Sequence, residues 1–115
     1  MPFLRFKGVE KALLKEIAPA LIDEFSHIAA IPKEIVKIEL LSIEQITDTP
    51  PSLEIFMFQR EKEKHDALAS RLYSLLSEHG YKNIHIFFVM LTHSLYYKEG
   101  SPLTEIPSLK QSVTS

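Results

Sequence analysis

The feature that most constrains the fold of this sequence is a strand–helix–strand pattern that occurs twice. Residues 3–8 alternate apolar and basic side chains, which is the period of a half-buried strand. Residues 10–29 carry apolar side chains at three- and four-residue spacing, which predicts an amphipathic helix, and residues 35–43 predict a second strand. Pro19 lies inside the helical stripe. Because the stripe continues in phase beyond it, we expect a kink there rather than a helix end.

The same pattern begins again after residues 49–52, whose two prolines cannot continue regular structure. Residues 53–59 predict a strand, residues 61–79 a helix and residues 84–91 a strong strand. Each strand–helix–strand run is long enough for a parallel crossover. The repeat therefore predicts an α+β fold with α/β character, in which two consecutive βαβ units form a four-stranded mixed sheet with two helices on one face.

The length of the chain limits it to one domain. With 115 residues and 45% hydrophobic content, there is material for one core and not for two. We predict a single domain over residues 1–100, with its halves at about 2–46 and 52–91. Residues 101–115 hold no hydrophobic period and contain two prolines, so we expect them to form a C-terminal tail.

Charge balance and cysteine content bound the partners and the compartment. The formal net charge of -2 gives no overall attraction to nucleic acid or to anionic membranes, so neither is an expected partner. The longest apolar runs are about eight residues, far below the roughly 20 needed to cross a bilayer, and we expect no secretion signal. The absence of cysteine excludes disulfides and a cysteine nucleophile and fits a reducing compartment, so the predicted location is the cytoplasm.

The five histidines give no metal-binding pattern. No two of them stand four residues apart on a predicted helix, so we predict no metal site. His27, His65 and His79 are interpreted as exposed helix residues, and His85 as a packed strand residue. The sequence has no glycine-rich phosphate loop, and we predict no cofactor.

The two faces of the predicted sheet differ in composition. One face should meet the helices, and it consists of Leu4, Phe6, Val36, Ile38, Leu40, Leu53, Ile55, Met57, Ile84, Ile86, Phe88 and Met90. The opposite face mixes charges with aromatic rings, and it consists of Phe3, Arg5, Lys7, Lys37, Glu39, Glu54, Phe56, Phe58, Arg60, His85, Phe87, Val89 and Leu91. Exposed phenylalanines would form an adhesive patch, and unpaired buried charges would be costly. We therefore predict an oligomer whose facing sheets bury the rings while the cations pair with the two glutamates.

Several short segments, in this order and spacing, resemble a known family. They are Met-Pro-Phe-Leu-Arg-Phe at the start, Phe58-Gln59-Arg60-Glu61 before the second helix, and Tyr96-Tyr97-Lys98-Glu99-Gly100 after the last strand. Together with the doubled βαβ, they resemble an uncharacterised bacterial branch, a domain of unknown function, of the tautomerase superfamily, which has the fold of macrophage migration inhibitory factor. The resemblance covers about residues 2–100. It implies a homotrimer with its sheets inside, its helices outside and pockets at subunit boundaries, and extra strands near 92–97 that pair with a neighbour.

The resemblance also implies a catalytic residue. In characterised members of the superfamily the initiator methionine is removed, and the exposed proline amine acts as general base or acid. Pro2 is the matching position. An amine in an apolar pocket near cations has its charged form disfavoured, so it can accept a proton from carbon near neutral pH. With Met1 in place the Pro2 nitrogen is an amide, and the alternative is that Pro2 only begins a strand, where a missing donor costs nothing.

Substrate-binding candidates follow from the same resemblance. Arg60 would hold a substrate carboxylate, helped by the positive N-terminus of the second helix. Lys37 falls at a strand position where some relatives carry a cation. Lys7 and His85 are placed near the site by parity and position alone, and Tyr97 would line a pocket of a neighbouring subunit.

Two functions remain open at this point. The first is a tautomerase-like isomerase that interconverts the keto and enol forms of a small carboxylate, with Pro2 as its base. The alternative is a non-catalytic trimer on the same scaffold that binds a small anion or a partner protein.

Overall fold

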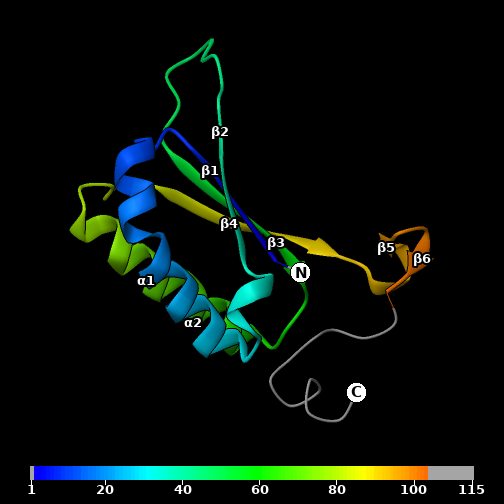
Figure 1. The fold of residues 1–115 in the computed structure, drawn as a ribbon. Coiled ribbons are helices and arrows are strands. Elements are labelled where there is room, and N and C mark those ends of the chain that lie inside the picture. The colour runs from blue at the N-terminus through cyan, green and yellow to red at the C-terminus, as the bar shows by residue number, and fades with distance from the viewer. Residues whose placement is uncertain (1, 104–115) are drawn as a thin grey trace.

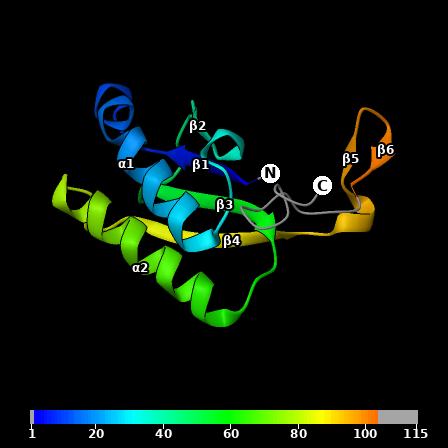
Figure 2. The ribbon, with the colours of Figure 1, turned by 60° about the horizontal axis from the view of Figure 1, so that its bottom comes forward.

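The strand and helix periods of the sequence produce one sheet with both helices against the same face (Figure 1 and Figure 2). The computed structural model describes residues 2–103. Its elements in chain order are β1 (Phe3–Lys7), α1 (Lys11–Ala29), η1 (Lys33–Ile35), β2 (Lys37–Leu41), β3 (Ser52–Phe58), α2 (Lys62–Glu78), β4 (His85–Leu91), η2 (His93–Leu95), β5 (Tyr97–Lys98) and β6 (Ser101–Pro102). The predicted fold is confirmed. Of the predicted tail, residues 104–115 lie outside the described residues.

The two halves join through their first strands. The sheet order is β2-β1-β3-β4, in which β1 and β2 are parallel, β3 and β4 are parallel, and β1 and β3 are antiparallel. Equivalent backbone hydrogen bonds run to the residue before each first strand: Lys37 N–H donates to the Pro2 carbonyl (3.1 Å), and His85 N–H donates to the Pro51 carbonyl (3.0 Å). The antiparallel centre places the start of β1 beside the end of β3.

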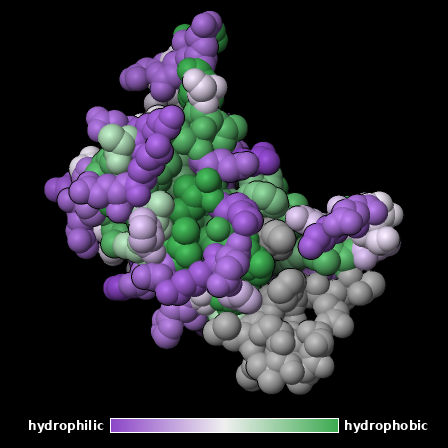
Figure 3. All heavy atoms as spheres, in the orientation of Figure 1, coloured by the Kyte–Doolittle hydropathy of each residue, from purple (hydrophilic) through white to green (hydrophobic). Residues whose placement is uncertain are grey.

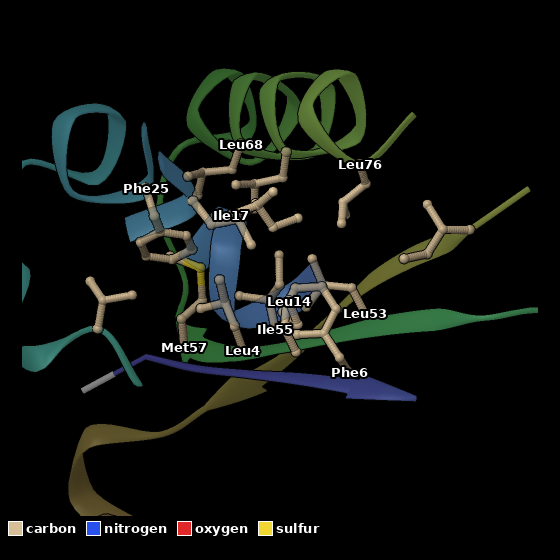
Figure 4. Close-up of a cluster of buried hydrophobic side chains, with 14 of the residues drawn as sticks. Leu4, Phe6, Leu14, Ile17, Phe25, Leu53, Ile55, Met57, Leu68 and Leu76 are labelled. Carbon is tan, nitrogen blue, oxygen red and sulfur yellow. The ribbon is translucent and has the colours of Figure 1, made fainter. Parts of the chain in front are cut away.

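Alternate side chains of the central strands are buried beneath the helices (Figure 4). This core includes Leu4, Phe6, Leu53 and Ile55 of the sheet, Leu14, Ile17, Leu21 and Phe25 of α1, and Leu68, Leu72 and Leu76 of α2. Burial of one such side chain contributes about 1.5–3 kcal/mol, so this face largely decides the fold. Met90, which parity places on the same face, is 41% exposed because β4 is an edge strand and Met90 borders an open hollow beside Gln59.

Polar contacts tie the two helices to each other. Arg71 Nη2 lies 2.7 Å from Glu24 Oε1, and Lys64 Nζ donates to the Ile28 carbonyl at 3.2 Å. Pro19 lies inside α1 as predicted, in an exposed position, and the kink expected there stays a prediction. In the described part of the chain, neither helix combines the length and the apolarity that crossing a membrane requires.

The sheet face opposite the helices carries the predicted mixture of charges and rings. Arg5 Nε lies 2.9 Å from Glu39 Oε1, and Lys7 Nζ lies 3.4 Å from Glu54 Oε1. The Arg5 guanidinium also lies 4.8 Å from the centroid of the Phe56 ring, which is a cation–π distance. These pairs form between neighbouring strands of one chain. Arg5, Lys7 and the two glutamates of this face therefore find partners without a second subunit, and the case for an oligomer rests on its exposed apolar surface.

Residues after β4 cover part of the same face. Phe58, predicted to need burial by another copy, is only 4% exposed because His93 stacks on it with 4.0 Å between ring centroids and Tyr96 packs at 5.6 Å. The extra strands near 92–97 were expected to pair with a neighbouring subunit, but the strand found there pairs within its own chain. β5 pairs with β6 of the same chain in a short hairpin that projects beyond the end of β4 (Figure 1).

The β2 edge of the molecule is incompletely covered. Ile38 and Leu40 are half-buried and, with residues of α1, line a hollow of about 320 Å³. Figure 3 shows apolar surface gathered between α1 and β2 on this side. The segment 42–49 that follows β2 is exposed, and Ile46 within it is 88% exposed. A single chain thus leaves apolar surface open to water at this edge.

Candidate active site

The start of β1 and the junction between β3 and α2 meet at a small cavity. Because β1 and β3 are antiparallel with Phe3 opposite Phe56, Pro2 lies beside the residues that end β3. Pro2 is buried there. The cavity is lined by Pro2, Phe25, Ala29, Ile31, Ile35, Met57, Phe58 and Arg60. The sheet register thus brings together Pro2 and Arg60, the two residues to which the sequence assigned catalysis and carboxylate binding.

The cavity is small and mostly apolar. Its volume is about 20 Å³, which is room for about one water molecule and far below the roughly 300 Å³ at which small-molecule pockets begin. Its single ionisable side chain is that of Arg60. In the described chain this space does not hold a keto acid, so a substrate site here requires the walls near Pro2 to open.

Arg60 differs from the other two arginines of the sequence. Arg5 is paired with Glu39 and Arg71 with Glu24, whereas among residues 2–103 no carboxylate forms an ion pair with Arg60. Arg60 is partly buried and precedes α2 by two residues, at the positive end of that helix. Its position and its lack of a carboxylate partner in this part of the chain suit it to an anionic ligand.

The sequence interpretation of His65 as an exposed helix residue was wrong. His65 is partly buried, and its Nε2 accepts a hydrogen bond from the Arg60 backbone N–H at 3.0 Å. Its Nδ1 is buried with no hydrogen-bond partner among the described residues, and its ring packs edge-on against Phe88 with 4.5 Å between centroids. The available signal was its position, because a side chain in the first turn of a helix can reach back to the turn before it.

Lys37 lies at the same end of the sheet as Pro2. Its backbone N–H bonds the Pro2 carbonyl, and its side chain is exposed. The ammonium donates to the Glu34 carbonyl at 2.8 Å, which directs it toward η1. Lys37 is absent from the residues that line the cavity.

Lys7 and His85 lie at the other end of the sheet. Lys7 is opposite Ser52, and Ser52 is opposite His85, so the register places both candidates at the end away from Pro2. Lys7 is five residue steps along an extended strand from Pro2, a span on the order of 17 Å. His85 is also exposed, which contradicts its interpretation as a packed strand residue. One chain does not bring these two side chains to the cavity.

Tyr97 is 58% exposed on β5 and is absent from the cavity lining. Its neighbour Tyr96 contacts Phe58, which does line the cavity. The hairpin therefore borders the site through Tyr96, and a role for Tyr97 in another subunit stays a prediction.

The groups with shifted pKa values lie outside the cavity lining. The hydrogen bond from Arg71 lowers the pKa of the Glu24 carboxyl, and the hydrogen bond to Asp23 raises the pKa of the Lys33 ammonium. Within residues 2–103, no group of three or more His, Cys, Asp or Glu side chains gathers in a way that would hold a metal ion.

Solved structures share this fold along most of the chain. A DUF1904 protein of Sebaldella termitidis has 25% sequence identity and a TM-score of 0.81, and the match covers 89% of this chain and 99% of that one. The macrophage migration inhibitory factor-like protein of Entamoeba histolytica has 18% identity and a TM-score of 0.67, covering 88% and 97%. A fused 4-OT has 15% identity and a TM-score of 0.73, covering 88% and 95%. No curated protein matches the sequence.

These likenesses confirm the resemblance to the tautomerase and macrophage migration inhibitory factor proteins at the level of fold. A family model described as a domain of unknown function, DUF1904, matches residues 1–102, which is most of the chain. The chain therefore belongs to the DUF1904 family and has the tautomerase-like fold.

Proposed function

We propose that this protein is a tautomerase-like enzyme that interconverts the keto and enol forms of a small carboxylate. The observation that carries the proposal is that Pro2 and Arg60 line one cavity, where Arg60 has no carboxylate partner within residues 2–103. A proton-transferring amine and a fixed cation are the two groups that such a reaction needs.

The proposed chemistry begins when Met1 is removed and the Pro2 nitrogen becomes a secondary amine. The apolar walls contributed by Phe25 and Met57, together with the nearby Arg60 cation, disfavour the charged ammonium. The neutral amine takes a proton from the carbon beside the carbonyl group while the carbonyl oxygen gains one from water, and the ammonium then gives its proton to the hydroxide left by that water. The ammonium returns a proton to carbon in the reverse direction, and Arg60 holds the carboxylate in both.

A substrate needs more room than the present cavity offers. Because β1 and β3 are paired as far as Phe3 and Phe56, the proposal requires side chains that line the cavity, rather than the strands, to move when a substrate binds.

We also propose that the protein is a homotrimer. Three features support assembly: Phe87 is 44% exposed on the sheet face, apolar surface is open beside β2, and β2 and β4 form the two edges of the four-stranded sheet. The similar fused 4-OT structure is described as a trimer. Light scattering should give about three times the 13.2 kDa mass of the chain, and a monomer would refute the proposal.

The enzyme proposal is tested in two steps. Intact mass spectrometry of untagged protein first shows whether Met1 is removed. Ketonisation of phenylpyruvate by the processed protein is then compared with that of Pro2→Ala and Arg60→Gln, with Arg71→Gln as the control because Arg71 is bound to Glu24 outside the cavity. We expect roughly a 100-fold loss of kcat in Pro2→Ala and an increase in KM in Arg60→Gln. Retained Met1, or unchanged activity in Pro2→Ala, would refute catalysis by Pro2.

A second candidate function is favoured by the size of the cavity. A buried Pro2 beside a space for about one water molecule suits a structural residue, and Arg60 would then bind a small anion at the rim. Calorimetric titration with pyruvate separates the two functions. A non-catalytic binder would lose pyruvate binding in Arg60→Gln and keep it in Pro2→Ala. It would show no ketonisation whether or not Met1 is removed.

A further inference from the structure

We propose that His65 is a positioning residue that fixes the turn carrying Arg60, so that the guanidinium is held at the Pro2 cavity for an anionic substrate. The inference rests on the proposed function, because it assigns a role at the same site. His65 does not line the cavity, so its effect must pass through Arg60.

The contact that carries the inference is the 3.0 Å hydrogen bond from the Arg60 backbone N–H to His65 Nε2. Glu61, the N-cap residue of α2, forms no side-chain capping bond, so among the described residues His65 is the side chain that bonds this turn. It acts as a displaced cap, reaching back five residues from the first turn of the helix.

The direction of this bond determines the form of the ring. A backbone amide can only donate, so Nε2 must be the unprotonated acceptor, and the hydrogen of the neutral ring lies on Nδ1. An imidazolium has two donors and no acceptor, and it cannot form this bond. The structure therefore requires a neutral His65 with a defined tautomer.

The ring itself is held from the sheet side. Phe88 of β4 packs against it edge-on, with 78° between the ring planes, and Nδ1 is buried without a hydrogen-bond partner among residues 2–103. A buried polar nitrogen left in this state is costly, and the Nε2 hydrogen bond together with the Phe88 contact must offset that cost.

A turn held in this way lowers the cost of binding at Arg60. Its backbone is tied to the sheet through His65 and Phe88, and α2 is tied to α1 by the bond from Lys64 to the Ile28 carbonyl. A cation presented from an ordered backbone loses less conformational freedom when it binds a carboxylate. Loss of the tie should therefore weaken binding of the substrate more than the chemical step.

Two substitutions separate the hydrogen bond from the packing. His65→Phe keeps a flat ring against Phe88 and removes the acceptor, whereas His65→Gln offers an amide oxygen that can accept from the Arg60 N–H. In phenylpyruvate ketonisation we expect KM to rise about 10-fold in His65→Phe with kcat nearly unchanged, and to return to within about threefold of wild type in His65→Gln. His27→Phe, an exposed histidine of α1, is the matched control. An unchanged KM in folded His65→Phe, or an equal rise in both variants, would overturn the inference.

A spectroscopic measurement tests the hydrogen bond between Arg60 N–H and His65 Nε2 without any substrate. Long-range proton–nitrogen NMR of histidine-labelled protein near pH 7.5 identifies the His65 ring as the one whose signals vanish in His65→Phe. That ring should carry its hydrogen on Nδ1, as should His79, whose Nδ1 lies 2.9 Å from the Leu75 carbonyl. If the ring lost in His65→Phe carries its hydrogen on Nε2, or is charged, the inference is overturned. Wild-type protein that is inactive but shows the expected tautomer would refute the proposed enzyme instead, so the two failures are distinguishable.

Discussion

Truncation of Phe87 tests whether the charged and aromatic sheet face is an assembly surface. Phe87 is 44% exposed in the single chain. Aromatic side chains bury about 150–250 Å², so the exposed part is roughly 65–110 Å². At about 25 cal/mol per Å², covering it in an oligomer contributes about 2–3 kcal/mol per chain. Phe87→Ala in all three subunits should therefore weaken a trimer by roughly 5–8 kcal/mol.

Light scattering over a dilution series measures this effect. Wild type should keep the trimer mass on dilution, while Phe87→Ala should fall to the monomer mass and retain its helical circular dichroism. Tyr73→Ala is the control, because Tyr73 is a comparably exposed aromatic residue (38%) on α2, away from the sheet face. If Phe87→Ala keeps the trimer mass on dilution as wild type does, the sheet face is not the assembly surface, and the argument from its exposed rings fails.

Three further predictions concern the single chain. Phe58→Ala removes a ring that is 4% exposed, so the free energy of unfolding in urea should fall by about 3–5 kcal/mol, and a fall below about 1 kcal/mol would contradict its packing. Gly8 has a φ of +77°, and an added Cβ would lie 3.1 Å from Pro51 Cα, so Gly8→Ala should lose at least about 1–2 kcal/mol in the same assay. The pKa of Glu24 is lowered by Arg71, so its contribution to stability is present above the ordinary glutamate pKa and is lost as pH falls through the lowered value. The difference in stability between wild type and Glu24→Gln should therefore disappear in acid, and a difference that is constant with pH would show that the ion pair is not its source.

Periodicity predicted most of the fold because it records which face of each element is buried. The alternation that placed Leu4 and Phe6 against the helices is a local property of β1, and it needs no knowledge of the neighbouring strands. The same parity predicted the cations and glutamates that pair on the opposite face, such as Arg5 with Glu39. What parity could not supply was that these pairs form inside one chain, because that depends on the strand order.

Contacts that depend on side chains from distant segments were missed. Phe58 is covered by His93 and Tyr96, which follow β4 and have no period that indicates where they pack. His65 looked like a surface residue because the sequence interpretation did not consider that a side chain in the first turn of a helix can bond the turn before it. Parity placed Lys7 on the face of the site, but Lys7 ends β1 whereas Pro2 precedes its first residue, and only the antiparallel register shows that the end of β3 meets Pro2.

The internal repeat gives a reason why the proposed reaction belongs to one end of the sheet and not to the other. Pro2 and Pro51 both precede a central strand, and the carbonyls of both accept the same backbone hydrogen bond. That bond is therefore a property of the fold, and it does not count as evidence that Pro2 is merely structural. The two ends differ in what surrounds the proline. Pro2 lines a cavity together with Arg60, whereas Pro51 is in close contact with Gly8. Pro51 can never have a free nitrogen, whereas Pro2 gains one when Met1 is cleaved, so the proline that shares a cavity with Arg60 is also the one that can become an amine.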